Sequence, residues 1–271
     1  MSTGASITWW GHSTTTIALG PVRILTDPVF TLRVAHLSRI GGPLPTEEAA
    51  DADVAVVSHL HFDHLHLPSL RKLSPEVRIV APVGTARALA RAAPAISRRV
   101  EEVAPGEAVD VDGVVIRAVR AAHDDRRSPL SRYCAPPLGF IIEAGSENPT
   151  RVWFAGDTGL FKGMSDFWPV DVAVIPIGGW GPTLGPTHLD PTQAAEAVRR
   201  VGAKDAVPVH FGTFWPLGLR YISRLSFRQR FVEPGPRFAA ALAACCPTST
   251  AHLLEVGNTA TVHDPGHDHA P

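Results

Sequence analysis

The sequence predicts a mixed α/β fold in which two packed β-sheets form one domain with helices on their outer sides. Three observations predict it. Short β-branched or aromatic runs dominate both ends of the chain, helical patterns alternate with apolar runs between them, and no long linker divides the 271 residues. We therefore expect a single domain over residues 1–262 and a disordered tail over the polar stretch 263–271.

Strands are expected where β-branched, aromatic or continuous apolar residues run together. These segments are 5–10, 14–19, 22–27, 52–58, 77–82, 98–103, 107–111, 114–123, 138–144, 150–157, 171–179, 205–212, 251–256 and 259–262. The run at 52–58 is nearly all apolar, which is typical of a strand buried on both faces. The last two segments are expected to pair with each other. Residues 38–47 and 124–137 are rich in Gly or Pro and are expected to form loops.

Helices are expected at 67–74, 83–93, 190–203 and 236–246. The pattern is clearest at 190–203, where Asp190 can cap the first turn, Pro191 fits that turn and Gly202 marks the end. Pro94 is expected to stop the helix at 83–93.

The composition is that of an ordinary globular protein, with 45% hydrophobic and 19% charged residues. The formal net charge of −1 gives no sign of a nucleic-acid-binding surface, and the arginines around Arg220–Arg230 are expected to lie on a solvated helix face. Three cysteines, two of them adjacent, make no disulfide framework. No apolar run is long enough for a membrane span and no signal peptide is expected, so the default location is the cytoplasm.

The stretch "SHLHFDHLHLP" at residues 58–68 concentrates metal-ligand side chains directly after the buried strand. It contains His59, His61, Asp63, His64 and His66. Residues two apart on an extended chain point the same way, so His59 and His61 can reach one metal ion. Asp63 and His64 lie at the following turn and can reach a second ion. Imidazole and carboxylate suit zinc, manganese or iron.

Three further ligand-type residues each lie at the carboxyl end of a different predicted strand. His123 ends "VVIRAVRAAH", Asp157 ends "TRVWFAGD" and His210 ends "DAVPVH". Open α/β sheets place their sites at such strand ends, so these residues are expected to join the His-rich stretch.

The ordered blocks "TWWGHSTTTI", "LTDPVF", "SHLHFDHL", "FAGDTG", "PIGGW" and "VHFGTFWP" make the chain resemble the metallo-β-lactamase fold superfamily over residues 6–262. The resemblance is to the branch that includes N-acyl-phosphatidylethanolamine phospholipase D and L-ascorbate-6-phosphate lactonase. It implies a four-layer αββα sandwich, in which two mixed sheets pack face to face between outer helices.

The resemblance also implies the ligand set of a two-metal site. His59, His61 and His123 would hold the first ion, and Asp63, His64 and His210 the second, with Asp157 as a bridge. Two divalent ions are expected, zinc first, with manganese or iron as alternatives. A hydroxide shared by the two ions would be the nucleophile.

Other polar residues are candidates for supporting roles. Asp63, His12 and His188 are the candidate catalytic side chains, and His188 could protonate a leaving group or bind a developing oxyanion. Asp27 is expected to orient a ligand histidine. His66 is expected either to contact a ligand residue without binding metal itself or to be exposed to solvent.

Two further groups of side chains lie near the expected site. The aromatic residues Trp180, Phe214, Trp215 and Tyr133 are candidates for an apolar pocket wall. Arg126, Arg127 and Arg132 follow His123, where the family often has aromatic or small polar residues. Their guanidinium groups suit a phosphate, but a solvated loop is the favoured explanation.

The expected function is a dinuclear metal-dependent hydrolase that cleaves a phosphodiester or related ester of a small molecule. A lactonase acting on a sugar-derived or sugar-phosphate lactone is the alternative. A non-catalytic metal-binding protein and a redox relative of the same fold stay open as another class, although flavin-linked di-iron relatives usually carry glutamate at the position of His61. No nucleic-acid partner is expected, and the oligomeric state stays open.

Overall fold

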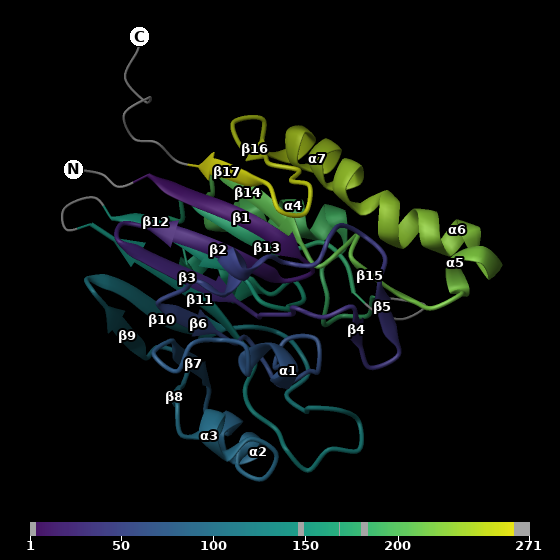
Figure 1. Cartoon of the computed structure of the whole chain (residues 1–271). Coiled ribbons are helices and arrows are strands. Elements are labelled where there is room, and N and C mark those ends of the chain that lie inside the picture. Colours follow the sequence, from purple (N-terminus) through teal and green to yellow (C-terminus); the bar gives the residue numbers. More distant parts are fainter. Residues whose placement is uncertain (1–3, 146–148, 168, 180–183, 263–271) are drawn as a thin grey trace.

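Two seven-stranded β-sheets pack face to face with helices on their outer sides, as the computed structural model shows in Figure 1. The structure describes residues 4–145, 149–167, 169–179 and 184–262. The predicted four-layer αββα sandwich is therefore confirmed. Within the described ranges, no helix combines the length and the apolar character that crossing a bilayer requires.

The first sheet has the strand order β17-β1-β2-β3-β6-β7-β8. These strands span Thr259–Val262, Ala5–Gly11, Thr14–Leu19, Val22–Thr26, Val54–Val56, Arg78–Pro82 and Val100–Val103. Neighbours are antiparallel from β17 to β3 and parallel from β3 to β8, so the sheet is mixed.

The second sheet has the order β16-β14-β13-β12-β11-β10-β9. Its strands span Thr250–Ala251, Asp205–Val209, Val172–Pro176, Thr150–Phe154, Leu138–Ala144, Val114–Arg120 and Ala108–Val111. Neighbours are parallel from β16 to β12 and antiparallel from β12 to β9.

The main core lies between the sheets and is made of alternate, fully buried side chains such as Ile7, Ile17, Ile116, Phe140 and Val174. A second cluster covers the outside of the second sheet beneath α4 (Pro191–Val201) and α7 (Pro234–Cys245). A third covers the outside of the first sheet beneath the short helices α1 (Leu67–Leu70), α2 (Thr85–Leu89) and α3 (Pro94–Ser97). Apolar faces on both sides explain why the central strands are nearly continuous apolar runs.

The helix expected at 190–203 is confirmed with its caps. Asp190 Oδ1 accepts hydrogen bonds from the backbone N–H groups of Thr192 and Gln193, and Gln193 Oε1 accepts one from the Asp190 N–H. Gly202 ends the helix in the left-handed region, at φ 70°.

Several predicted elements differ in the structure. The segment 67–74 forms only the single turn of α1, and Pro94 begins α3 rather than merely stopping α2, because proline fits a first helical turn. The strand expected at 114–123 ends at Arg120.

The predicted pairing of the last two strands is wrong. Strand β16 pairs with β14 in the second sheet, and β17 pairs with β1 in the first. The chain crosses between the sheets at this point because each sheet has an open edge there that a short strand can cover.

A small third sheet was not expected. Strands β15 (Phe214–Pro216), β5 (Leu37–Arg39) and β4 (Arg33–Val34) pair in this order, partly within the loop predicted at 38–47. Strands of two or three residues carry too few side chains to show a period of two, so no pattern in the sequence indicates them.

Candidate metal centre

The candidate site forms where strands that run in one direction end. In the first sheet, β1, β3 and β6 run the same way and are followed by His12, Asp27 and His59. In the second sheet, β10, β12 and β14 share a direction and lead to His123, Asp157 and His210. Because the sheets face each other, one edge of the sandwich collects side chains from six strands.

Three imidazoles make the first ligand group. His61 Nδ1 lies 2.9 Å from His59 Nε2 and 3.2 Å from His123 Nε2. Burial lowers the pKa of all three side chains, that of His123 to about 4, and neighbouring imidazoles lower it further. The three imidazole side chains are therefore neutral near pH 7, and each can offer a nitrogen lone pair to one cation.

Asp63, His64 and His210 make the second group. Asp63 Oδ2 lies 3.7 Å from His64 Nε2 and 3.9 Å from His210 Nε2. Asp157 Oδ2 lies between the groups, 3.1 Å from His210 Nε2, 3.4 Å from His64 Nε2 and 4.0 Å from His123 Nε2. This arrangement brings together all seven residues that the sequence nominated as ligands.

Several donor atoms of this centre form no hydrogen bonds with one another and are suited to binding metal ions. His64 Nε2, His210 Nε2 and Asp157 Oδ1 are buried without a hydrogen-bond partner. Buried polar atoms are nearly always paired, so buried atoms of this kind in one centre fit a bound cation. The chemistry of the set, five imidazoles and two carboxylates, suits zinc, manganese or iron.

Asp27 fixes the orientation of the second group from behind. This fully buried carboxylate accepts hydrogen bonds from His64 Nδ1 at 2.6 Å, from the Ser58 hydroxyl at 2.6 Å and from the Ser58 N–H at 2.7 Å. In the neutral form of His64, Nδ1 donates to Asp27, so Nε2 carries the lone pair that faces Asp157. Burial penalises the charged form of His64, but the carboxylates of Asp157, Asp27 and Asp63 outweigh it and raise its pKa well above the usual value.

His12 holds Asp63 in place. Its Nε2 lies 3.0 Å from Asp63 Oδ2, and burial together with the nearby His210 lowers the pKa of His12 to about 4. A neutral His12 therefore donates its Nε2–H to the Asp63 carboxylate. The sequence marked His12 as a candidate catalytic side chain but did not indicate this direct contact with a candidate ligand. Its backbone is in the left-handed region, at φ 53°.

His188 faces the same centre from the loop after β13. His188 Nε2 lies 3.6 Å from Asp157 Oδ2, and Nδ1 donates to the Leu184 carbonyl oxygen at 3.1 Å. The nitrogen that faces the ligands thus carries a lone pair. Burial lowers the pKa of His188, which favours this neutral form.

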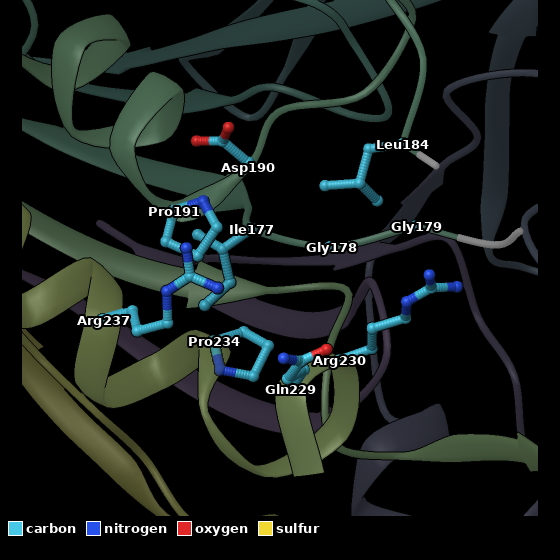
Figure 2. A pocket seen from close by; sticks show the side chains of 10 residues that line it. All are labelled: Ile177, Gly178, Gly179, Leu184, Asp190, Pro191, Gln229, Arg230, Pro234 and Arg237. Carbon is cyan, nitrogen blue, oxygen red and sulfur yellow. The ribbon is translucent and has the colours of Figure 1, made fainter. Parts of the chain in front are cut away.

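Two glycines allow this close packing. A Cβ atom on Gly179 would lie 2.6 Å from His188 Cδ2, and one on Gly178 would lie 2.8 Å from the His210 carbonyl oxygen. The same two residues line a separate cavity of about 280 Å³ together with Arg230 and Arg237, seen in Figure 2. Gly178 and Gly179 therefore lie beside both that cavity and the two histidines.

His66 belongs to no ligand group among the described residues. Its side chain is buried, which excludes the predicted alternative of an exposed residue, and its Nδ1 lies 2.8 Å from Ser69 Oγ. Ser69 Oγ in turn accepts a hydrogen bond from the Phe30 N–H. His66 therefore joins the start of α1 to the loop after β3.

A pocket of about 450 Å³ opens onto the ligands. His61, Asp63, Asp157 and His188 lie among its lining residues, and its remaining wall is mainly apolar. The small β4–β5 hairpin contributes Val34 and Leu37 to this wall, and the loops contribute Phe62 and Pro129.

The aromatic wall that the sequence suggested is not the wall of this pocket. Phe214 and Trp215 line a smaller cavity beside His210, and Tyr133 lies in neither. Trp180 lies outside the described residues.

Arg127 is a supporting residue whose role the sequence left open. Its Nη1 donates to the Leu60 carbonyl oxygen at 2.7 Å, and its guanidinium lies 4.4 Å from the ring centroid of Phe62. It thereby ties the loop after His123 to the loop that carries His59–His64. Arg126 and Arg132 are exposed, as a solvated loop predicts. No local pattern in the sequence distinguishes Arg127 from Arg126 and Arg132.

The comparisons with known proteins agree with this geometry. The Beta-lactamase superfamily domain matches residues 22–211. N-acyl-phosphatidylethanolamine-hydrolyzing phospholipase D 1 of Caenorhabditis elegans is 29% identical over 79% of this chain, which spans 65% of that protein. A UPF0173 metal-dependent hydrolase of Thermoplasma volcanium is 30% identical over 77% of this chain and 84% of its own length.

Among solved structures, the metallo hydrolase Igni18 of Ignicoccus hospitalis superposes with a TM-score of 0.70 at 22% identity. The superposition covers 96% of this chain and 99% of Igni18, so the two proteins share the whole fold. The family match covers most of the chain and includes five of the six strand ends that build the ligand cluster. The chain therefore belongs to the metallo-β-lactamase superfamily.

Proposed function

We propose that this chain is a metal-dependent hydrolase that holds two divalent ions and cleaves a phosphodiester or a related ester. The observation that carries the proposal is the convergence of seven ligand-type side chains, three of which leave buried atoms without a partner in the protein. A purely structural cluster would pair these atoms with one another.

Each ligand group supplies three side chains for one ion, and Asp157 Oδ2 is close to both groups. When bound, two such ions polarise an ester oxygen and lower the pKa of a water molecule near it. Zinc suits the imidazole-rich first group, with manganese or iron as alternatives.

The side chains around the ligands hold the centre rigid and position a proton acceptor. Asp27 and His12 fix His64 and Asp63 by short hydrogen bonds. We assign to His188 the acceptance of a proton from the attacking water or from a substrate hydroxyl, because its Nε2 lone pair faces the centre. Once Nε2 holds that proton, the imidazolium can pass it to a leaving group, which is the role that the sequence suggested for His188.

The pocket supports an ester with an apolar substituent more than a sugar-derived lactone. Val34, Leu37, Phe62 and Pro129 offer hydrocarbon surface beside the ligands. The polar residues His36, Ser128 and Arg127 also line the pocket, but the Arg127 guanidinium already contacts the Leu60 carbonyl oxygen and the Phe62 ring. The relative named a phospholipase D acts on such a phosphodiester, which supports the same choice for this chain.

The test combines elemental analysis with a turnover screen of the zinc- and manganese-loaded protein. We expect about two ions per chain and turnover of bis(p-nitrophenyl) phosphate above that of a lactone panel and a β-lactam. Asp157→Ala should lower the metal content and abolish turnover, whereas Asp166→Ala, which removes an exposed carboxylate, should change neither.

Full turnover in Asp157→Ala or in metal-free protein would refute the proposal. Two bound ions without turnover of any ester would favour the non-catalytic metal-binding alternative. Faster turnover of lactones than of the phosphodiester would favour the lactonase.

A further inference from the structure

Residues Leu217–Val232 form a helical segment at one end of the molecule, which we call the 217–232 segment. It contains α5 (Leu219–Ile222), α6 (Arg224–Phe227) and a wider helical turn at Arg228–Val232. Figure 1 shows α5 and α6 beyond the far end of α7, away from both sheets.

The inner side of this segment is held by aromatic contacts. The Phe227 and Phe231 rings stack with their centroids 4.7 Å apart, and they lie edge-on to Trp215 at 5.4 and 6.2 Å. These contacts fix the segment on the protein and determine which side chains point outward.

The outer side carries large apolar side chains in solvent. Leu217, Tyr221, Ile222 and Leu225 are 70%, 65%, 81% and 67% exposed. Single exposed apolar residues are ordinary, but several within nine positions of the chain mark an interaction surface. The segment is therefore not the simple solvated helix face that its arginines suggested.

Positive charge accompanies these apolar side chains. The segment contains Arg220, Arg224, Arg228 and Arg230 and has no Asp or Glu. Arg228 pairs with an acidic side chain nearby, that of Glu233 at 2.6 Å. A two-fold contact with a second copy of the chain would bring these arginines together, so like charges would oppose it.

We propose that the 217–232 segment docks on the surface of an anionic lipid bilayer. Its apolar side chains would enter the boundary between headgroups and acyl chains, and its guanidinium groups would contact lipid phosphates. The segment is broken at Ser223, between α5 and α6, and a fluid surface adapts to such an interrupted face.

The position of the segment places a docked bilayer beside the candidate site. Arg230 and Phe231 line the small cavity that also contains His210, and Figure 2 shows Arg230 and Gln229 near Gly178 and Gly179. The inference goes beyond the proposed hydrolysis and does not depend on it, because binding to vesicles can be measured without turnover.

The experiment is co-sedimentation of the full chain with vesicles of phosphatidylcholine alone and with vesicles that also contain phosphatidylglycerol. We expect binding to the anionic vesicles that weakens as salt is added and is much lower without phosphatidylglycerol. Each arginine near such a surface contributes about fivefold to partitioning, so Arg220→Gln with Arg224→Gln should reduce it by roughly 25-fold.

The apolar contribution is tested by Ile222→Ser with Leu225→Ser, which should reduce partitioning by at least about tenfold. Leu130→Ser is the matched control, because Leu130 is a fully exposed leucine in a different loop. Arg126→Gln is the control for charge, because Arg126 is exposed outside the segment. Metal content and circular dichroism report whether each variant is folded.

Equal binding by the wild type and both double variants would overturn the proposal, as would equal binding to zwitterionic and anionic vesicles. Light scattering is measured in parallel. A wild-type dimer that Leu225→Ser dissociates, without vesicle binding, would assign the face to a second copy of this chain instead. Binding to polyglutamate but not to vesicles would assign it to an acidic protein.

Discussion

Replacing Asp27 by asparagine tests whether this buried carboxylate determines the metal affinity of the second ligand group. Asparagine keeps the shape of the side chain and tolerates the left-handed backbone at this position, where φ is 34°. The amide can still accept a hydrogen bond from the Ser58 N–H through its oxygen. Its NH₂ group, however, then faces His64 Nδ1, which donates to Asp27 in the wild type.

The magnitude follows from the contacts that change. To avoid two donors in contact, His64 must take the other neutral tautomer, and Nε2 then carries a proton instead of the lone pair that faces Asp157. A hydrogen bond to a charged group contributes about 1.5–3 kcal/mol. Its loss corresponds to a fall of about 10–100-fold in affinity for the ion, the usual effect of removing such a partner of a ligand histidine.

The assay is titration of metal-free protein with Zn²⁺ in competition with a chromophoric chelator, which resolves the two equivalents. The equivalent bound by the second ligand group should weaken most in Asp27→Asn, because Asp27 contacts His64 directly and reaches the first group only through the Ser58 hydroxyl, which lies 2.9 Å from His59 Nδ1. Asp53→Asn is the matched control, since Asp53 also accepts a 2.7 Å hydrogen bond from a backbone N–H, that of Arg23, and is remote from the ligands. Wild-type affinity for both equivalents in a folded Asp27→Asn protein would refute the reasoning.

Three further predictions concern other residues. His66→Ala should keep the wild-type metal content, because His66 Nδ1 faces Ser69 rather than the ligands, and a lost equivalent in elemental analysis would show that His66 is a ligand. Arg127→Ala should lower metal affinity by roughly tenfold by freeing the Leu60 carbonyl, whereas Arg126→Ala should not; equal effects in the chelator titration would contradict this. Below the raised pKa of His64, protonation competes with the ion, so affinity for one equivalent should fall by about tenfold per pH unit on acidification. The equivalent bound by His59, His61 and His123 should be retained to lower pH because their pKa values are lowered, and loss of both equivalents in parallel would contradict the assignment.

The candidate ligand residues could be singled out in the sequence because their signal is local. His59, His61, Asp63 and His64 follow one buried strand without interruption, and each of the remaining ligands comes directly after a short apolar run. The family resemblance supplied the grouping into two sites, and the structure brings the same residues together. The fold class was predictable for a similar reason, since most strands are long enough to show an apolar pattern.

The pocket and the supporting contacts could not be predicted in this way. Val34 and Leu37 lie on strands of two or three residues that form only because β5 pairs with β15, about 175 positions later in the chain. Arg127 has two arginines nearby with the same local signal, and only the position of Phe62 and the Leu60 carbonyl distinguishes it. Such contacts depend on which distant segments of the chain pack together, and a single sequence does not show which segments these are.

The backbone around the metal centre adds a reason to regard it as built for function. Of the five described non-glycine residues with positive φ, three are His12, Asp27 and His210, each directly after a strand that leads to the site. Left-handed backbone is unfavourable for such residues and persists only where the surrounding structure enforces it. Here the turn sends the chain away from the sheet while the side chain stays at its edge. Strain of this kind, at three strand ends that deliver a ligand or its partner, is difficult to explain by stability alone, because a glycine would relieve it.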